Sequence, residues 1–189
     1  RDLGSLEKTG VLRRVRGGAV ATGKDTGVEP HFATKLVHAA SIKRALARYA
    51  VSRHVFDGAT IALEGGTTIA SLAPLLSSNL KLTVLTNSLE VVHQCQPELD
   101  LLCSGGLFRA VSRTFVGPHA KRFFEDHSAD VAFISATGVS PDGWLLDPNT
   151  LEIEIKRILC RRAAKVVLIL DASKWIRTSV SRVVSLEAV

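Results

Sequence analysis

The sequence of 189 residues contains no methionine, not even at position 1. Because translation starts with methionine, we expect that this chain is not a complete translation product. Long apolar runs are also lacking, since none approaches the roughly 20 residues that a membrane-spanning helix needs. The charged N-terminus does not have the pattern of a signal peptide. We therefore expect a soluble, cytoplasmic protein that does not contact a membrane.

Cysteine is scarce, and its copies form no recognisable motif. Cys95, Cys103 and Cys160 are odd in number and lie in apolar surroundings, which argues against a disulfide framework and against a CxxC metal site. The six histidines lack the spacing of metal ligands. We expect no metal, no cofactor and a reducing compartment.

The composition is that of one globular domain with a short appendage. Hydrophobic residues make up 46% and charged residues 22% of the chain, which is enough for one substantial core. The net charge is +6, and about half of this excess lies in the first sixteen residues. A local basic patch is typical of contact with a nucleic-acid backbone. The candidate DNA-binding residues are Arg1, Arg13, Arg14 and Arg16.

The chain divides into three regions. Residues 2–9 have helical character and residues 11–15 alternate like a short strand, so residues 1–19 are interpreted as the remnant of a small domain. Residues 20–31 are rich in glycine without periodicity and are predicted to be a linker. Residues 32–189 form the main domain. It begins with one long predicted helix over residues 32–53, whose apolar face carries Ile42, Leu46, Tyr49 and Ala50.

The rest of the main domain alternates between apolar strands and helices. Such continuous apolar strands predict an α/β fold with a mostly parallel, Rossmann-like sheet covered by helices on both faces. The predicted strands are near 60–64, 82–86, 99–103, 131–136 and 166–170, and the predicted helices are near 67–78, 87–94, 116–126 and 150–163. Ligands of such sheets bind at the carboxyl ends of the strands. Polar clusters occur at these ends, namely Gly66-Thr67-Thr68, Thr86-Asn87-Ser88, Gly105-Gly106, Thr137-Gly138 and Asp171–Lys174.

The first of these clusters has the pattern of a phosphate-binding turn. Gly65 and Gly66 allow a close approach of the backbone, and the helix that follows directs N–H groups and its positive dipole end at an anion. Thr67 and Thr68 add hydroxyl donors. A tight turn with a threonine cap explains the same residues equally well.

Several other polar residues have structural alternatives. Asn87 with Glu90, and Asn149 with Glu152, have the spacing of capping boxes. Glu152 is also four residues from Lys156, so cap, surface ion pair and ligand contact remain open. The Asp171–Lys174 segment is compatible with an anion site or with an Asx turn. Arg109 and Arg113 are loop arginines that could meet an anion or remain solvated.

Taken together, these motifs resemble the effector-sensing domain of the DeoR family of bacterial transcriptional repressors. The resemblance rests on Gly66–Thr68, Thr86–Ser88, Gly105-Gly106, Glu152…Lys156-Arg157 and Asp171–Lys174 in this order. Residues 1–19 resemble the end of the recognition helix and the wing of that family's winged helix-turn-helix. The resemblance implies a repressor that binds a DNA operator and a phosphorylated sugar and forms a homo-oligomer, a dimer or a tetramer. It also implies that most of the DNA-binding domain and the last strand of the sensor are missing.

The family's sensor is itself similar to ribose-5-phosphate isomerase, which suggests a sugar-phosphate isomerase as the alternative function. The isomerase has a carboxylate pair and a lysine where this chain has Ala136–Val139 and Trp144–Asp147. Only Glu152 remains as a possible base, so we expect a receptor and not an enzyme.

The resemblance assigns roles to the candidate site residues. Gly66, Thr67, Thr68 and Lys174 are expected to hold a phosphate, and Lys43 matches a lysine typical of the family. Asn87, Glu152, Lys156 and Asp171 are expected to contact hydroxyls or to order the pocket. Glu64 stands where the family more often has aspartate, and is expected to influence specificity. The full predicted effector site is Glu64, Gly66, Thr67, Thr68, Thr86, Asn87, Ser88, Gly105, Gly106, Gly138, Glu152, Lys156, Asp171, Ser173 and Lys174.

Overall fold

The computed structural model describes residues 12–15, 18–21, 29–175 and 181–189. The predicted helix 2–9, Arg1 and Arg16 lie outside the described residues, as do the side chains of Arg13 and Arg14. β1 (Leu12–Val15) and β2 (Gly18–Ala21) pair as an antiparallel hairpin. The predicted strand 11–15 therefore corresponds to β1, and β2 extends to Ala21, two residues into the segment predicted as a linker.

A five-stranded parallel sheet forms the centre of the main domain, as predicted. Its strand order is β11-β8-β3-β4-β5. The bounds are β3 Thr60–Leu63, β4 Thr83–Thr86, β5 Asp100–Cys103, β8 Ala129–Ile134 and β11 Ala163–Leu168. Since all five strands run in one direction, their carboxyl ends lie along one edge of the domain.

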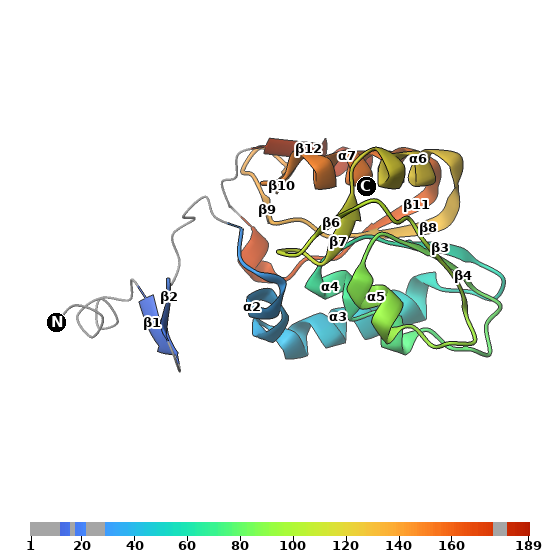
Figure 1. Cartoon of the computed structure of the whole chain (residues 1–189), viewed down its shortest axis with the longest axis horizontal. Helices are drawn as coiled ribbons and strands as arrows, with labels where there is room; N and C mark the ends of the chain where they lie inside the picture. Colours follow the sequence, from blue (N-terminus) through green and yellow to red (C-terminus); the bar gives the residue numbers. More distant parts are fainter. Residues whose placement is uncertain (1–11, 16–17, 22–28, 176–180) are drawn as a thin grey trace.

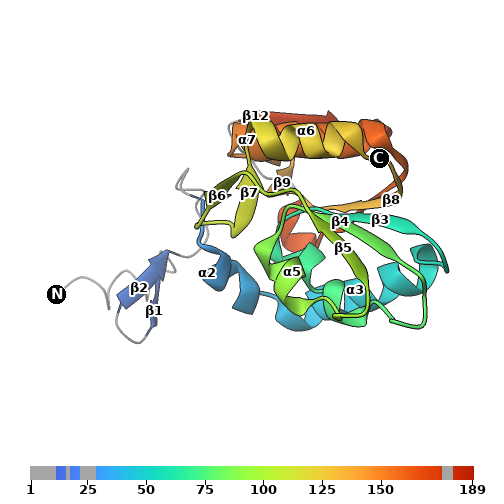
Figure 2. The same ribbon diagram turned by 45° about the vertical axis from the view of Figure 1, so that its right-hand side comes forward.

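Helices cover both faces of the sheet (Figures 1 and 2). One apolar core joins the sheet to α3 (Ala40–His54), α4 (Thr67–Ala70) and α5 (Leu89–Gln94). The other core joins it to α6 (Pro118–Asp126) and α7 (Thr150–Arg162). Burial on both faces explains why the central strands β3, β4 and β8 are largely apolar without alternation. The doubly covered parallel sheet confirms the predicted fold class.

The single helix predicted over residues 32–53 is wrong. The structure has α2 (Phe32–Val37) and α3, separated by His38 and Ala39, and Ala39 adopts the left-handed conformation with φ 53°. The predicted apolar face is also partly wrong, because Ile42 and Tyr49 are exposed. Lys43 is buried instead, alongside Ala47 and Ala50. Apolar spacing alone did not reveal this, because Lys43 is buried through its hydrogen bonds.

Ala39→Gly is expected to stabilise the chain by about 0.5–1 kcal/mol. A non-glycine residue pays a steric cost in the left-handed region, and glycine removes that cost, although its greater freedom in the unfolded chain offsets part of the gain. Urea denaturation measures the change. Ala45→Gly, at an exposed site inside α3, is the matched control and should destabilise by about 1 kcal/mol. A loss of stability in Ala39→Gly would contradict the left-handed conformation.

The predicted helix 67–78 is also shorter than expected. α4 ends at Ala70, and a 3-10 turn over Ala73–Leu75 follows. Pro74 has no N–H to donate to the carbonyl of Ala70, so the α-helical ladder cannot continue.

Two small antiparallel sheets were not predicted. β6 (Leu107–Arg109) and β7 (Thr114–Val116) form a hairpin next to the strand ends. A second sheet has the order β12-β10-β9, with β9 Gly138–Val139, β10 Trp144–Asp147 and β12 Ser181–Ser185. Single-turn 3-10 helices lie at Ala172–Lys174 and Leu186–Ala188. Among the described residues, no helix has both the length and the apolar character needed to cross a membrane.

Candidate functional site

The loop after β3 brings hydroxyl groups and a buried ammonium together. Gly66 has φ +118° and precedes α4, whose first two residues, Thr67 and Thr68, are both buried. The Lys43 Nζ donates to Thr67 Oγ1 at 2.9 Å and to the carbonyl oxygen of Lys35 at 2.5 Å. α4 spans only four residues, so its dipole is weak. The case for an anion here therefore rests on the lysine and the hydroxyls.

Further charges surround Lys43. Burial lowers the pKa of its ammonium, and the positive charge of Lys174 lowers it further, while Asp171 opposes the change. Lys35 also repels it. An anion placed among these lysines would remove the repulsion and restore the pKa of Lys43. The cluster of Lys43, Lys174 and Thr67 is thus electrostatically suited to a phosphate.

Asp171 combines a structural role with one acceptor atom that has no partner. Its Oδ1 accepts from the backbone N–H of Ser173 at 2.9 Å and from the Ser173 hydroxyl, as in an Asx turn. Although burial raises the pKa of Asp171, the hydrogen bonds of Ser173 and the charges of Lys174 and Lys43 hold it below its usual value. Among the described residues, Oδ2 is buried without a hydrogen-bond partner. Of the two alternatives left open by the sequence, the Asx turn is therefore present, and Oδ2 remains as a buried acceptor.

Asn87 supplies a second unpartnered acceptor, at the end of β4. Its Nδ2 donates to the carbonyl of Phe115 at 3.0 Å, and its buried Oδ1 has no partner in the described part of the chain. A Cβ on Gly65 would lie 3.9 Å from this oxygen and only 2.2 Å from Thr114 Cγ2. Gly65 is thus required for the close approach of the loop Glu64–Thr68 to β7, with Asn87 beside it. We call this loop the phosphate loop, after the role predicted from the sequence.

The residues on either side of Asn87 are used within the fold. Thr86 Oγ1 donates to the carbonyl of Leu63 at 2.7 Å and accepts from the N–H of Ser88. Ser88 caps α5 by accepting from the N–H of Val91. The predicted capping box of Asn87 and Glu90 is wrong, because Ser88 is the cap. The Glu90 carboxylate instead accepts a hydrogen bond from Gln94 Nε2 and forms an ion pair with Arg113.

Glu152 contacts the β6–β7 hairpin. Asn149 caps α7 through Oδ1, which accepts from the N–H groups of Leu151 and Glu152. The carboxylate of Glu152 does not complete a capping box but accepts from Arg109 at 2.6 Å and from Thr114 Oγ1 at 2.8 Å. Burial opposes its ionisation, but Lys156, the nearby hydroxyls and Arg109 hold its pKa below the usual value. Glu152 is therefore a stable carboxylate.

Lys156 lies in a buried ion cluster and not in the surface pair considered from the sequence. Its Nζ is 2.5 Å from Glu64 Oε1 and 3.1 Å from Asp147 Oδ2. Burial raises the pKa of Glu64 to about 7, and the negative charges of Asp147 and Glu152 act in the same direction. The same carboxylates raise the pKa of Lys156 in spite of its burial. The structure thus connects α7 to β3 and β10 through Lys156.

Three predicted glycines have backbone roles. A Cβ on Gly106, which has φ +110°, would lie 2.8 Å from the carbonyl oxygen of Val116. Gly105 has φ +59° with open space around it, and Gly138 pairs with Leu146 in the small sheet. Sequence reasoning did not single out Asp147. Its position at the end of the apolar run Leu145-Leu146, which makes it a strand-end carboxylate, is the signal that could have found it.

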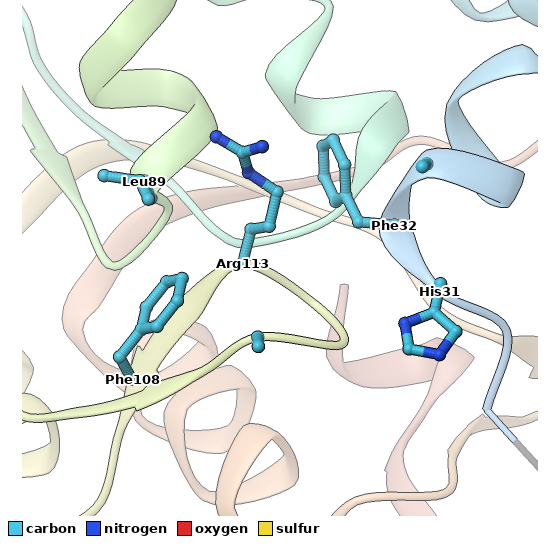
Figure 3. Close-up of a pocket in the computed structure, with 7 residues that line it drawn as sticks. His31, Phe32, Leu89, Phe108 and Arg113 are labelled. Carbon is cyan, nitrogen blue, oxygen red and sulfur yellow. The ribbon is translucent and has the colours of Figure 1, made fainter.

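The pocket drawn in Figure 3 lies next to this site. It has a volume of about 440 Å³, and its walls are His31, Phe32, Ala33, Leu89, Phe108, Ala110 and Arg113. Arg113 lies beside Phe32, with Cζ 5.9 Å from the ring centre. None of the predicted effector residues lines this pocket. Within the described ranges, no group of three His, Cys, Asp or Glu residues is arranged to hold a metal ion.

A family model described as the DeoR C terminal sensor domain matches residues 38–189. The chain belongs to the DeoR family. Its curated relatives include the uncharacterized HTH-type transcriptional regulator YulB of Bacillus subtilis, which is 30% identical over all of this chain and 73% of its own length. GlpR of Haloferax volcanii, an HTH-type transcriptional regulator, is 32% identical over all of this chain and 74% of its length. The prediction of a transcriptional regulator with a DeoR sensor domain is confirmed.

Solved structures confirm the fold of this DeoR-family chain. Ribose 5-phosphate isomerase A of Methanocaldococcus jannaschii matches with a TM-score of 0.52 and 20% identity, over 72% of this chain and 55% of that one. The delta subunit of eIF2B from Chaetomium thermophilum matches with a TM-score of 0.59 and 12% identity, over 83% of this chain and 57% of that one. At these identities the likeness extends to the fold alone.

Proposed function

We propose that this DeoR-family chain senses a phosphorylated sugar at the carboxyl ends of its parallel strands. The observation that carries the proposal is the cluster formed by Lys43, Thr67 and Lys174, where buried positive charge and hydroxyl donors converge. The unpartnered oxygens of Asp171 and Asn87 lie on either side of the phosphate loop and suit the hydroxyls of a sugar. A ligand with an anionic end and a polyol end matches this arrangement.

Sensing would regulate DNA binding through the segment that leads to the N-terminal hairpin. A ligand shifts an equilibrium between two arrangements only if it binds one of them more tightly. In a homo-oligomer, a dimer or a tetramer, such a shift would change how two DNA-binding domains fit the half-sites of an operator in the cytoplasm. We propose this as the route from effector to operator.

The alternative function, an isomerase-like enzyme, is disfavoured by the state of the carboxylates. A general base must lie within reach of the substrate, with a pKa near the operating pH. Glu152 has a lowered pKa and already accepts from Arg109 and Thr114. Glu64 has a pKa near neutrality, but its carboxylate faces Lys156 inside the ion cluster. We therefore propose a receptor without catalytic activity.

Lys174→Ala is expected to weaken binding of ribose 5-phosphate by at least about tenfold, because a buried phosphate loses one of its opposite charges. Isothermal titration calorimetry against ribose 5-phosphate, ribose and inorganic phosphate measures this. Lys165→Ala, at an exposed site in β11, is the matched control and should bind like the unaltered chain. Equal binding by Lys174→Ala would disprove the phosphate assignment, and isomerisation of ribose 5-phosphate during the titration would favour the enzyme.

A further inference from the structure

The segment of chain that leads into the sensor contacts two of the predicted effector residues, Thr67 directly and Glu152 through Arg109. We call residues 29–37, which include α2, the strap. Near its middle, the backbone N–H of Phe32 donates to the carbonyl of Val111 at 2.8 Å, and the Phe32 side chain is buried. Towards its other end, the carbonyl of Lys35 accepts from Lys43 Nζ, which also donates to Thr67. The strap thus contacts both the β6–β7 hairpin and the phosphate loop.

The start of the strap is connected to Glu152 through Arg109. The Arg109 guanidinium donates to Glu29 Oε2 at 2.9 Å and to Glu152 Oε1 at 2.6 Å. Glu29 also pairs with Lys35 at 3.2 Å. We call Glu29, Arg109 and Glu152 the relay. Their side chains are 13%, 17% and 9% exposed, respectively. A relay of largely buried charges therefore joins the strap to the site.

We propose that Arg109 is a further ligand-binding residue, and that Glu29 is an internal anion which an effector displaces from it, releasing the strap. This inference rests on the proposed function. A ligand hydroxyl that donates to Glu152, or a ligand oxygen that accepts from Arg109, competes directly with the relay. Both residues lie beside Thr114, which contacts Glu152 and packs on the phosphate loop at Gly65.

Displacement has a consequence for the strap because Glu29 is poorly hydrated. A partly buried carboxylate that loses its guanidinium partner is destabilised unless it moves into water. Lys35 alone would remain, as a more exposed partner. Glu29 would therefore move outward and carry the start of the strap with it. Effector binding and strap position are coupled in this way by one side chain.

Glu29→Ala tests the fastening of the strap without any ligand. We expect backbone amides of residues 29–37 to exchange hydrogen for deuterium about fivefold faster than in the unaltered chain, because opening costs less free energy. Glu98→Ala, at an exposed site before β5, is the matched control and should leave this exchange unchanged. Unchanged exchange of residues 29–37 in Glu29→Ala would overturn the proposal.

The second measurement adds ribose 5-phosphate to the unaltered chain and to Glu29→Ala. We expect protection at residues 65–70, faster exchange at residues 29–37 of the unaltered chain, and about fivefold tighter binding by Glu29→Ala. Protection at residues 65–70 with unchanged exchange of the strap would overturn the inference but leave the proposed function intact. Unchanged exchange at both places would overturn the proposed function, and the displacement of Glu29 with it.

Discussion

Lys156→Met should reduce the free energy of unfolding by about 3–5 kcal/mol, because it leaves the carboxylates of Glu64 and Asp147 buried without their shared counter-ion. Lys156 is 3% exposed and contacts both of them. Methionine keeps most of the volume of the lysine stem, so the loss reports on charge and not on packing. Urea denaturation measures it. Lys81→Met, at an exposed site, is the matched control and should cost less than about 0.5 kcal/mol.

The loss should depend on pH in a defined direction. The pKa of Glu64 is raised to about 7, so the folded chain binds its proton more tightly than the unfolded chain does. The contribution of Glu64 to stability therefore falls as the pH rises from about 4.5 through 7. Without Lys156 the ionised form is still less favourable, so the loss in Lys156→Met should be smaller at pH 5 than at pH 8. An equal loss at both values would contradict the burial of an unpaired Glu64 as its cause.

Gly106→Ala should destabilise the chain by roughly 2–4 kcal/mol. Two costs add, since alanine is strained at φ +110° and its Cβ would lie 2.8 Å from a backbone oxygen that cannot rotate away. Gly105→Ala is the matched control, because it has a positive φ but open space, and should cost only about 1 kcal/mol. Thermal and urea denaturation compare the two. Unchanged stability of Gly106→Ala together with weaker ligand binding would instead support the ligand contact predicted from the sequence.

The parallel sheet could be predicted because its strands read as short apolar runs, and the central strands β3, β4 and β8 are buried on both faces. The strands of two to four residues in the small antiparallel sheets could not be predicted from the sequence. β6, β7, β9 and β10 have no periodicity long enough to read, and tertiary contacts decide their pairing. These elements nevertheless carry Arg109, Thr114 and Asp147 into the site.

The candidate site was predicted as a set of positions but not as a set of contacts. The strand-end rule selected Thr67, Asn87 and Asp171, which the structure places near charged or unpartnered groups. The same rule could not show that Lys156 forms an ion pair with Glu64, or that Glu152 accepts a hydrogen bond from Arg109, because those partners are far apart in sequence. Local alternatives such as caps and i, i+4 pairs are all that a short window can offer.

The Glu64–Lys156 pair also bears on the order of folding. The two residues are 92 positions apart, so their contact closes a long loop and requires β3 and α7 to be already in place. Contacts of such separation form slowly, after local helices and turns. We therefore expect both side chains to stay hydrated until β3 and α7 have met, so that the cost of removing their water falls late in folding.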